Sequence, residues 1–360
     1  MPPPSHKSLR NGLASPPVAP EPARGPLTIN DIARLADVSK KTVSRVINKS
    51  PLVTEETRAR VEAVIREHGY EPNPQARGLA LRRAFLIGLI YDNPSPSYVV
   101  NMQHGALDAL AGTGFELVVR PCDRRAPDFL DEIRAFVTRQ RPAGVILPPS
   151  VSEDPALARL LAELECPYVR IASVKLDRKA RTVLTHDAAG AAAAAVHLAD
   201  LGHRRIAHIS GPSTFRSAHE RRRGFIAGLA ERGLELAEAY DKVAGYTYAS
   251  GVEQARALLT LPVRPTAIFA GNDEMAVGVY RAAHDLGLSI PDDLSVVGYD
   301  DAPIASQVWP ALSSVRLPIR DMGKVAAERL LQLATAPDEA GELVEFTPTL
   351  VARDSSAAPR

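Results

Sequence analysis

The residues best suited to chemistry in this chain are hydrogen-bond donors gathered in one short stretch, Ser39–Asn48. They are long or adaptable polar side chains: Lys40, Lys41, Ser44, Arg45 and Asn48. Base edges in the major groove of DNA and phosphate oxygens accept hydrogen bonds from side chains of these types. Val43, Val46 and Ile47 recur among them at the i, i+3, i+4 spacing of a helix. The stretch therefore predicts a helix with one buried face and one face suited to nucleic acid.

Two further helices are expected to hold that stretch in place. One covers Ile29–Ala36, and a tight turn at Asp37 separates it from the polar helix. A third runs from Thr54 to about His68, with acidic residues in its first turn. The ends of the three helices are marked by capping or turn residues, namely Thr28, Asp31, Ser39, Thr54 and Gly69. Two short helices with a supporting third predict a helix-turn-helix.

A second set of polar residues falls where strands are expected to end. It comprises Asp92, Asn93, Arg120, Ser173, Asn272 and Asp300, with Ser217 and Arg221 near the start of a helix. In open parallel sheets, ligands bind beyond the carboxyl ends of the strands. A single residue of this kind more often caps a helix, but the joint placement of all eight indicates a small-molecule pocket.

These residues belong to a body in which short apolar strands alternate with amphipathic helices. Strands are expected at Phe85–Ile90, Phe115–Val119, Gly144–Leu147 and Tyr168–Ile171, and then at Ile206–Ser210, Thr266–Ala270 and Leu294–Gly298. Helices are expected near residues 99–113, 127–139, 154–164, 190–201, 219–232, 250–259 and 274–286. The strands are continuously apolar, as strands covered on both faces should be. Two such lobes in series predict a ligand between them.

Both regions resemble the lac repressor family. In the head the resemblance lies in Thr28–Ala33, Thr42–Asn48 and Tyr70–Arg77, and in the body it lies in residues 202–212, 221–225, 272–276 and 297–301. It implies an all-α helix-turn-helix head on an α/β core of two doubly wound parallel-sheet lobes, similar to periplasmic binding proteins. Asp37 stands where the family usually has glycine. Aspartate tolerates a left-handed conformation, so the turn is expected to be kept.

The resemblance also assigns roles to individual residues. It implies that Thr28, Ser39 and Thr42 join the polar helix in contacting DNA. Family ligand contacts correspond by motif to Ser217, Arg221, Asn272 and Asp300, and by looser alignment to Tyr246.

These effector-site residues suit a polyhydroxy ligand, since a carboxylate accepts hydroxyls, arginine donates to them and an aromatic face covers a sugar ring. A purine would also suit Arg221 and Asp300, and Leu317 stands where some sugar-responsive members have a polar contact. Tyr98, Phe215 and Trp309 are further candidates for ring stacking, although ordinary packing is expected of each.

Between head and body, Asn73–Arg83 is expected to form a hinge. About two helical turns could follow Pro74, which is too few to be stable alone in water. Such a segment would order only when paired with a second copy on DNA. The resemblance implies that Leu79 wedges into the minor groove beside Ala76 and Arg77. Gly78 departs from the family and costs about 1 kcal/mol of helix propensity; a flexible linker is the alternative.

Charge is distributed unevenly along the chain. The formal net charge is +1, but Leu27–Arg83 carries +4 and Ala84–Arg360 carries −5. A basic head on an acidic body is the layout of a DNA-binding protein whose second domain does something else. Cys122 and Cys166 form neither a disulfide framework nor a metal-ligand spacing, which suits a reducing cytosol.

The expected domains follow from these observations. They are a disordered Pro-rich leader (1–26), the helix-turn-helix (27–72), the hinge helix (73–83), a two-lobed effector-binding and dimerisation core (84–345) and a C-terminal strand and tail (346–360). The leader lacks the apolar run of a signal peptide or membrane helix. No 18-residue apolar span follows it, so no membrane association is expected.

Neither catalysis nor a cofactor is expected. His197, His203 and His208 lack neighbouring ligands for a metal, and no nucleophile elbow or phosphate loop occurs. The rival hypotheses are a periplasmic-type sugar-binding transport protein, which the head argues against, and an enzyme on a doubly wound fold.

The sequence therefore predicts a cytoplasmic, nucleoid-associated repressor of carbohydrate-utilisation genes that a small sugar releases from a pseudo-palindromic operator. A homodimer is expected because one recognition helix reads too few base pairs. A tetramer stays open, although no leucine heptad follows Leu333. The alternatives are a purine or another metabolite as effector, and a corepressor in place of an inducer.

Overall fold

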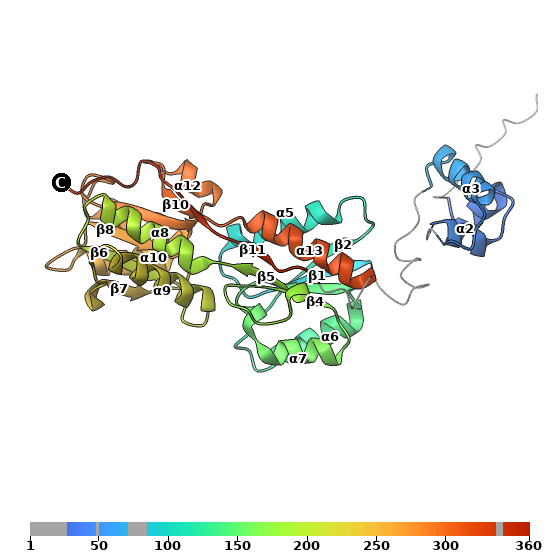
Figure 1. Ribbon diagram of the computed structural model, residues 1–360, viewed down its shortest axis with the longest axis horizontal. Coiled ribbons are helices and arrows are strands. Elements are labelled where there is room, and N and C mark those ends of the chain that lie inside the picture. Colours follow the sequence, from blue (N-terminus) through green and yellow to red (C-terminus); the bar gives the residue numbers. More distant parts are fainter. Residues whose placement is uncertain (1–26, 48–49, 71–84, 336–340) are drawn as a thin grey trace, which may run out of the picture. The chain divides into compact units, whose positions relative to one another are not determined.

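The computed structural model describes residues 27–47, 50–70, 85–335 and 341–360, which belong to two compact units divided between Asn73 and Pro74. The first unit is the head, built from helices α1 (Ile29–Leu35), α2 (Lys40–Ile47) and α3 (Glu55–Glu67) (Figure 1). Its core consists of small and branched apolar side chains, namely Ile32, Ala33, Ala36, Val43, Val46 and Val61. The helix-turn-helix prediction is confirmed.

The turn between α1 and α2 depends on Asp37. Its φ is 49°, in the left-handed region, so aspartate adopts the conformation expected of it in place of glycine. At the start of α1, the Asp31 carboxylate accepts hydrogen bonds from the backbone N–H of Thr28 (3.0 Å) and from Thr28 Oγ1 (2.7 Å). These bonds lower the pKa of Asp31. The first turn of the head is therefore fixed by local hydrogen bonds as well as by packing.

The second unit is the body, which contains two six-stranded sheets. The sheet of lobe one has the order β11-β5-β4-β3-β1-β2, and all its strand pairs are parallel. Its strands are β1 (Leu86–Tyr91), β2 (Glu116–Pro121), β3 (Gly144–Leu147), β4 (Tyr168–Ala172), β5 (Thr182–Thr185) and β11 (Val344–Phe346). The helices of this lobe are α5 (Pro96–Leu110), α6 (Phe129–Gln140), α7 (Pro155–Glu163) and α13 (Ile319–Thr335).

Lobe two repeats this architecture with the order β12-β10-β9-β8-β6-β7, in which only β12 is antiparallel to its neighbour. Its strands are β6 (Ile206–Ser210), β7 (Asp241–Val243), β8 (Ala267–Ala270), β9 (Ser295–Asp300), β10 (Ser313–Arg316) and β12 (Thr349–Val351). Its helices are α8 (Asp187–Asp200), α9 (Arg216–Ala230), α10 (Tyr248–Leu259), α11 (Asp273–Asp285) and α12 (Pro303–Gln307). Two parallel-sheet α/β lobes confirm the predicted fold class.

The chain passes between the lobes three times, after β5, after β10 and after β11. The second passage returns α13 to lobe one, where it packs against α5 (Figure 1). Gly105 permits this close packing, because a Cβ there would lie 1.8 Å from the carbonyl oxygen of Arg320. The three passages place the carboxyl ends of both sheets around one shared space.

Several elements at or next to the sheet edges were not expected from the sequence. Strands β5, β7 and β10 have three or four residues each and include Thr, Ser, Asp, Lys and Arg, so no continuous apolar run marks them. Helix α13 was also missing from the expected elements. The C-terminal segment, expected as a strand and tail over 346–360, contains β12 of lobe two, whereas β11 of lobe one begins before it, at Val344. Beyond it, the Ser355 hydroxyl bonds to Val296 O and Ser313 N in lobe two.

No helix in the described ranges is long and apolar enough to cross a membrane.

Candidate functional site

The predicted DNA-contacting residues of the head lie along α2 and at the start of α1. Lys40 and Lys41 are exposed in the first turn of α2, and Thr42, Ser44 and Arg45 are partly buried. Ser39 caps α2, since its Oγ accepts from the Thr42 N–H at 3.1 Å and lies 2.9 Å from Thr42 Oγ1. The predicted contacts Asn48, Asn73, Ala76, Arg77 and Leu79 lie outside the described residues.

A pocket lies between the two lobes of the body, and its empty space, open mouth included, is about 410 Å³. Seven of the nine predicted effector residues line it, namely Asn93, Tyr98, Ser217, Arg221, Tyr246, Asn272 and Asp300. The remaining lining residues are Ser95, Pro149, Thr185, Asp187, Phe215, Leu317 and Met322. The strand-end argument therefore located a shared pocket.

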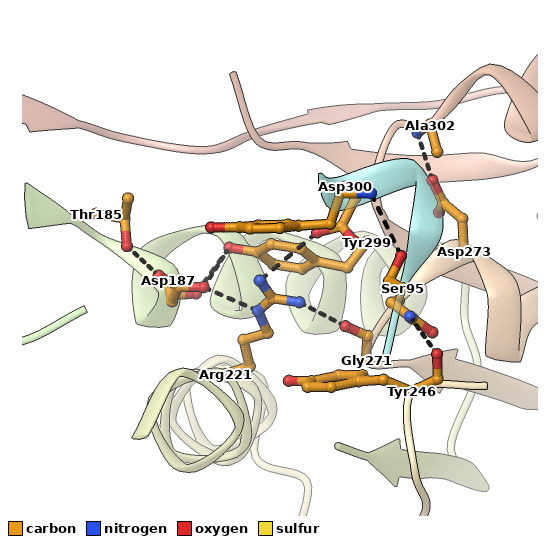
Figure 2. A network of polar contacts seen from close by, with 12 residues as sticks. Ser95, Thr185, Asp187, Arg221, Tyr246, Gly271, Asp273, Tyr299, Asp300 and Ala302 are labelled. Carbon is orange, nitrogen blue, oxygen red and sulfur yellow. Dashed lines mark hydrogen bonds and ion pairs between the residues drawn. The ribbon is translucent and has the colours of Figure 1, made fainter. Parts of the chain in front are cut away.

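Arg221, in the second turn of α9, lies at the centre of this pocket (Figure 2). Its Nε donates to Asp187 Oδ1 at 2.8 Å, and its Nη1 donates to the carbonyl oxygen of Gly271 at 2.6 Å. The guanidinium carbon lies 3.7 Å from the centre of the Tyr299 ring, so the cation stacks on an aromatic face. Burial works against its charge, but Tyr246, Asp187 and the other acidic neighbours raise the pKa of Arg221. The arginine is therefore charged and oriented.

Close packing of α9 against α8 brings Arg221 to Asp187. Gly224, one turn after Arg221, allows this approach, because a Cβ there would lie 2.0 Å from the carbonyl oxygen of Ala188. Thr185 Oγ1 also hydrogen-bonds to the Asp187 carboxylate, and the Tyr299 hydroxyl lies 3.4 Å from it. Asp187 therefore sits in a dense network that links the end of β5 to α9 and β9.

Asp300 is the last residue of β9 and faces the same arginine. Its Oδ1 lies 3.6 Å from Arg221 Nη2, too far for a hydrogen bond, and this buried oxygen has no hydrogen-bond partner among the described residues. Burial raises the pKa of Asp300 to about 7, with Asp187 and Glu274 adding to the effect and Arg221 opposing it. Its φ of 103° is unusual for a residue with a side chain, a feature that concentrates at functional sites.

Three aromatic residues form apolar walls. Phe215 and Tyr246 meet edge to face with ring centres 5.4 Å apart. Tyr98 is buried in the first turns of α5, and its hydroxyl lacks a hydrogen-bond partner in the described part of the chain. Burial raises the pKa of Tyr98, and raises that of Tyr246 to about 12, so both phenols are neutral at pH 7. Such faces suit the C–H surface of a sugar ring.

The two amide residues of the pocket also support the backbone. Asn272 Oδ1 accepts from the Met275 N–H at 2.9 Å and so caps α11, while its Nδ2 donates to Tyr246 O at 3.0 Å. Asn93 Oδ1 accepts from the Ser95 N–H at 2.9 Å. These bonds hold three strand-end loops in register around the pocket.

Two predicted effector residues do not line the pocket. Asp92 lies beside Arg124, with Oδ2 3.9 Å from Nε, because successive side chains leaving a strand point to opposite sides. Ser173 lies next to Val174, which lines a neighbouring cavity. Trp309 corrects a third expectation, since it is 90% exposed and is not packed in the core.

Asp187, Thr185 and Ser95 are pocket residues that sequence reasoning missed. Thr185 ends β5 and Asp187 starts α8, so the strand-end argument would have found both if β5 had been recognised. Ser95 caps α5, a common structural role that gives no separate signal.

Side-chain contacts join the lobes around the pocket. Ser95 Oγ donates to Glu274 Oε1 at 2.8 Å, and burial raises the pKa of that glutamate. Arg124 Nη2 donates to Thr214 O at 3.2 Å. The backbone N–H of Arg216 donates to Glu153 Oε2 at 3.0 Å. The described arrangement is therefore one in which the lobes are held together.

Comparisons with known proteins agree with both halves of this description. Residues 28–73 match the model of bacterial regulatory proteins of the lacI family, and residues 195–356 match a periplasmic binding protein-like domain. The ribose operon repressor of Escherichia coli (strain K12) is 32% identical over 91% of this chain and 99% of its own length.

Two solved structures extend the match to three dimensions. A lac repressor dimer bound to operator and an anti-inducer has a TM-score of 0.76 at 29% identity, covering 93% of this chain and 100% of that one. A complex of the transcriptional regulator CelR with cellobiose has a TM-score of 0.70 at 30% identity, covering 91% and 99%. With a three-helix head, a two-lobed core and relatives aligned over almost their whole length, this chain belongs to the lacI family of bacterial transcriptional regulators.

Proposed function

We propose that this protein represses carbohydrate-utilisation genes in the cytoplasm, by binding a pseudo-palindromic operator as a homodimer and releasing it when a small sugar occupies the body. Residues 73–83 are the proposed hinge between the two activities. The observation that carries the proposal is the pocket around Arg221 and Asp300, which sits where the lobes meet in a chain that also has a helix-turn-helix head.

The head supports the DNA-binding part. Lys40 and Lys41 are exposed beside the N-terminus of α2, where helix backbone N–H groups also favour anions such as phosphate. The opposite face of α2 packs into the head core through Val43 and Val46. The donors are thus presented by a helix that the core holds rigidly.

The chemistry of the pocket supports the sugar part. Asp300 supplies a carboxylate acceptor, Arg221 a charged donor, and Tyr98 with Tyr246 aromatic faces and hydroxyls. Both CelR, solved with cellobiose, and the ribose operon repressor are sugar-related by name. Because the lobes touch across the pocket, a ligand that favours one lobe arrangement would shift the equilibrium that the hinge senses.

Exposed apolar residues support the dimer. Trp309 is 90% exposed after α12, and Val100 and Leu107 on α5 are each 46% exposed. Elements α5 and α12 lie along the same upper edge of the body in Figure 1. We propose that these side chains belong to one association surface, since contiguous exposed apolar patches mark such surfaces.

Selection from randomised DNA duplexes, followed by fluorescence anisotropy over a salt titration, tests the DNA-binding part. The expected result is a two-fold symmetric sequence bound more tightly than random duplex, with affinity falling as salt rises. Equal affinity for all duplexes would overturn the repressor proposal.

A thermal-shift screen of sugars and purines tests the effector. A bound sugar is expected to raise the melting temperature by mass action and to weaken operator binding in the same samples. A shift by purines alone, or tighter operator binding with the sugar, would overturn this part.

A further inference from the structure

The charges lining the pocket are unequal in a way that bears on the kind of sugar it accepts. Among the described lining residues, Arg221 is the one cation, whereas Asp187 and Asp300 both contribute carboxylates. Glu274 stands close enough behind Asp300 to act on it electrostatically. With both aspartates ionised, the lining carries a net negative charge.

Arg221 is a poor receptor for an anion, because protein groups already engage two of its three nitrogens and one of its faces. Its Nε is hydrogen-bonded to Asp187 and its Nη1 to Gly271 O, and its face lies against Tyr299. The Asp187 carboxylate neutralises its charge at 2.8 Å. An incoming carboxylate or phosphate would have to compete with this buried pair.

Asp300, by contrast, has a carboxylate oxygen that lacks a hydrogen-bond donor within the part of the chain that the structure describes. Its Oδ1 is buried without a hydrogen-bond partner among the described residues and lies 3.6 Å from Arg221 Nη2. An unsatisfied buried acceptor is costly, and a ligand hydroxyl would satisfy it. Above the pKa of Asp300, which is about 7, a ligand carboxylate would instead place a second negative charge beside it.

The neighbouring cavity does not supply the missing positive charge. Its lining includes Arg124 and Arg216, but also Glu153 and Glu220. Arg124 is further engaged by the carbonyl oxygens of Ser150 and Thr214. The charges of these two arginines are therefore already offset by the two glutamates, so the described lining of the cavity offers no net positive charge to an acidic group of the ligand.

We propose that the effector is an uncharged polyhydroxy sugar, and that Asp300 makes the pocket select against sugar acids and sugar phosphates. The proposal rests on the sugar-responsive function proposed above. Asp300 accepts a hydrogen bond from a ligand hydroxyl, and the Asp187–Arg221 pair orients the arginine toward a second one.

Calorimetry at pH 8 with matched pairs tests this selection on the full-length protein. The pairs are D-glucose with D-glucuronate, D-galactose with D-galacturonate, D-glucose with glucose 6-phosphate, and D-ribose with ribose 5-phosphate. The neutral member of at least one pair is expected to bind about tenfold or more tightly than its acidic partner, as unfavourable burial of like charges implies. An acidic member that binds as tightly as its neutral partner, or more tightly, overturns the proposal.

The Asp300→Asn variant tests whether the preference for neutral over acidic sugars depends on the Asp300 carboxylate. It keeps the size of the side chain and removes its charge, so the neutral-to-acidic affinity ratio should fall by about tenfold. Asp200→Asn, which removes an exposed carboxylate of α8 outside the pocket, should leave the ratio unchanged. An unchanged ratio in folded Asp300→Asn overturns the role of Asp300.

The outcomes separate this inference from the function on which it rests. Preference for acidic sugars overturns the inference and leaves a sugar-responsive repressor. Binding of purines with no response to any sugar overturns the proposed effector class and this inference with it. The wild-type comparison stands even if a variant fails to fold.

Discussion

Arg221 is held by Asp187, Gly271 and Tyr299 with no contribution from a ligand. Its guanidinium is therefore oriented in advance, and a ligand does not have to order a long side chain on binding. Asp300 is the opposite case, because its buried carboxylate lacks a hydrogen-bond partner within the described chain. Arg221 is therefore held in place by the protein, whereas Asp300 has an acceptor oxygen available for a ligand.

The raised pKa of Asp300 predicts a pH dependence of stability. Burial raises this pKa to about 7 from an ordinary value of 3.8. The protonated carboxyl therefore favours the folded state, and this contribution is full below pH 3.8 and is lost as pH rises through about 7. The free energy of unfolding of the wild type should therefore fall by on the order of 4 kcal/mol across that range, and that of Asp300→Asn should not.

Urea unfolding at a series of pH values measures this difference. Asp200→Asn serves as a control, because pairing with Arg232 lowers the pKa of Asp200 and its titration lies outside the range. Parallel stability curves for wild type and Asp300→Asn would contradict the assignment.

Lys40 and Lys41 predict base recognition by the head. Replacing either by alanine should weaken operator binding by about 1–3 kcal/mol and relax the preference at one position of each half-site. Selection of preferred duplexes for each variant measures both effects. Arg60→Ala, which removes an exposed cation of α3, is the control. A uniform loss over all sequences would show that the lysines contact phosphates instead.

At the scale of elements, strand ends and helix starts build the pocket together. Asp300 is the last residue of β9, and Asn93 and Asp187 each follow the end of a strand, β1 and β5, by two residues. Ser217 and Asn272 lie at the starts of α9 and α11. Because these elements come from both sheets, relative movement of the lobes changes the pocket directly. The contact between α5 and α11, made by Ser95 and Glu274, is one place where such movement would be felt.

Glu274 is therefore predicted to stabilise the closed arrangement of the lobes. Glu274→Ala removes the acceptor of Ser95 without removing a pocket-lining side chain, and should weaken effector binding by about tenfold, as for the loss of a hydrogen bond to a charged group. Calorimetry with the sugar found in the screen measures this. Glu253→Ala, on the exposed face of α10, should have no effect. Unchanged affinity for Glu274→Ala would argue against the closure role.

The hinge gives a second prediction at this scale. Leu79→Ala should weaken operator binding and leave effector binding unchanged, since the predicted role of Leu79 is to wedge between base pairs. Anisotropy on the selected operator and calorimetry on the sugar measure the two activities in parallel. Equal operator affinity would remove the wedge hypothesis.

At the scale of the whole molecule, the proposed function requires two copies. One α2 helix reads only a few base pairs, and two-fold pairing roughly doubles the base-contact free energy. The exposed Trp309, Val100 and Leu107 are the apolar side chains proposed to meet in that pairing.

Trp309→Arg is predicted to break the dimer. Burying an unpaired charge in an apolar interface is strongly unfavourable, so sedimentation velocity should show a monomer at concentrations where wild type is a dimer. Operator affinity should fall with it. Val263→Arg changes another residue that is 61% exposed and serves as the control. A dimeric Trp309→Arg variant would place the interface elsewhere.

Local patterns in the sequence were sufficient for the head and for most of the fold. Helix caps, the Val43 and Val46 stripe and the turn at Asp37 are local features, so they determine the helix-turn-helix without knowledge of distant contacts. Strands β1 and β9 could also be predicted, because a strand that is buried on both faces has a continuously apolar sequence. Five pocket residues, Asn93, Ser217, Arg221, Asn272 and Asp300, followed from the topology of parallel sheets.

The tertiary structure decided what depends on long-range packing. Strands β5 and β10 are short and polar, and exist because neighbouring strands supply their hydrogen bonds, so Asp187 could not be placed from the sequence. The side to which Asp92 turns depends on the pleat of β1 and on Arg124. The hydrogen bond from Arg221 to Asp187 and the Asp300 oxygen that has no partner among the described residues are likewise products of packing between α8, α9 and β9, because the residues involved lie far apart in the chain.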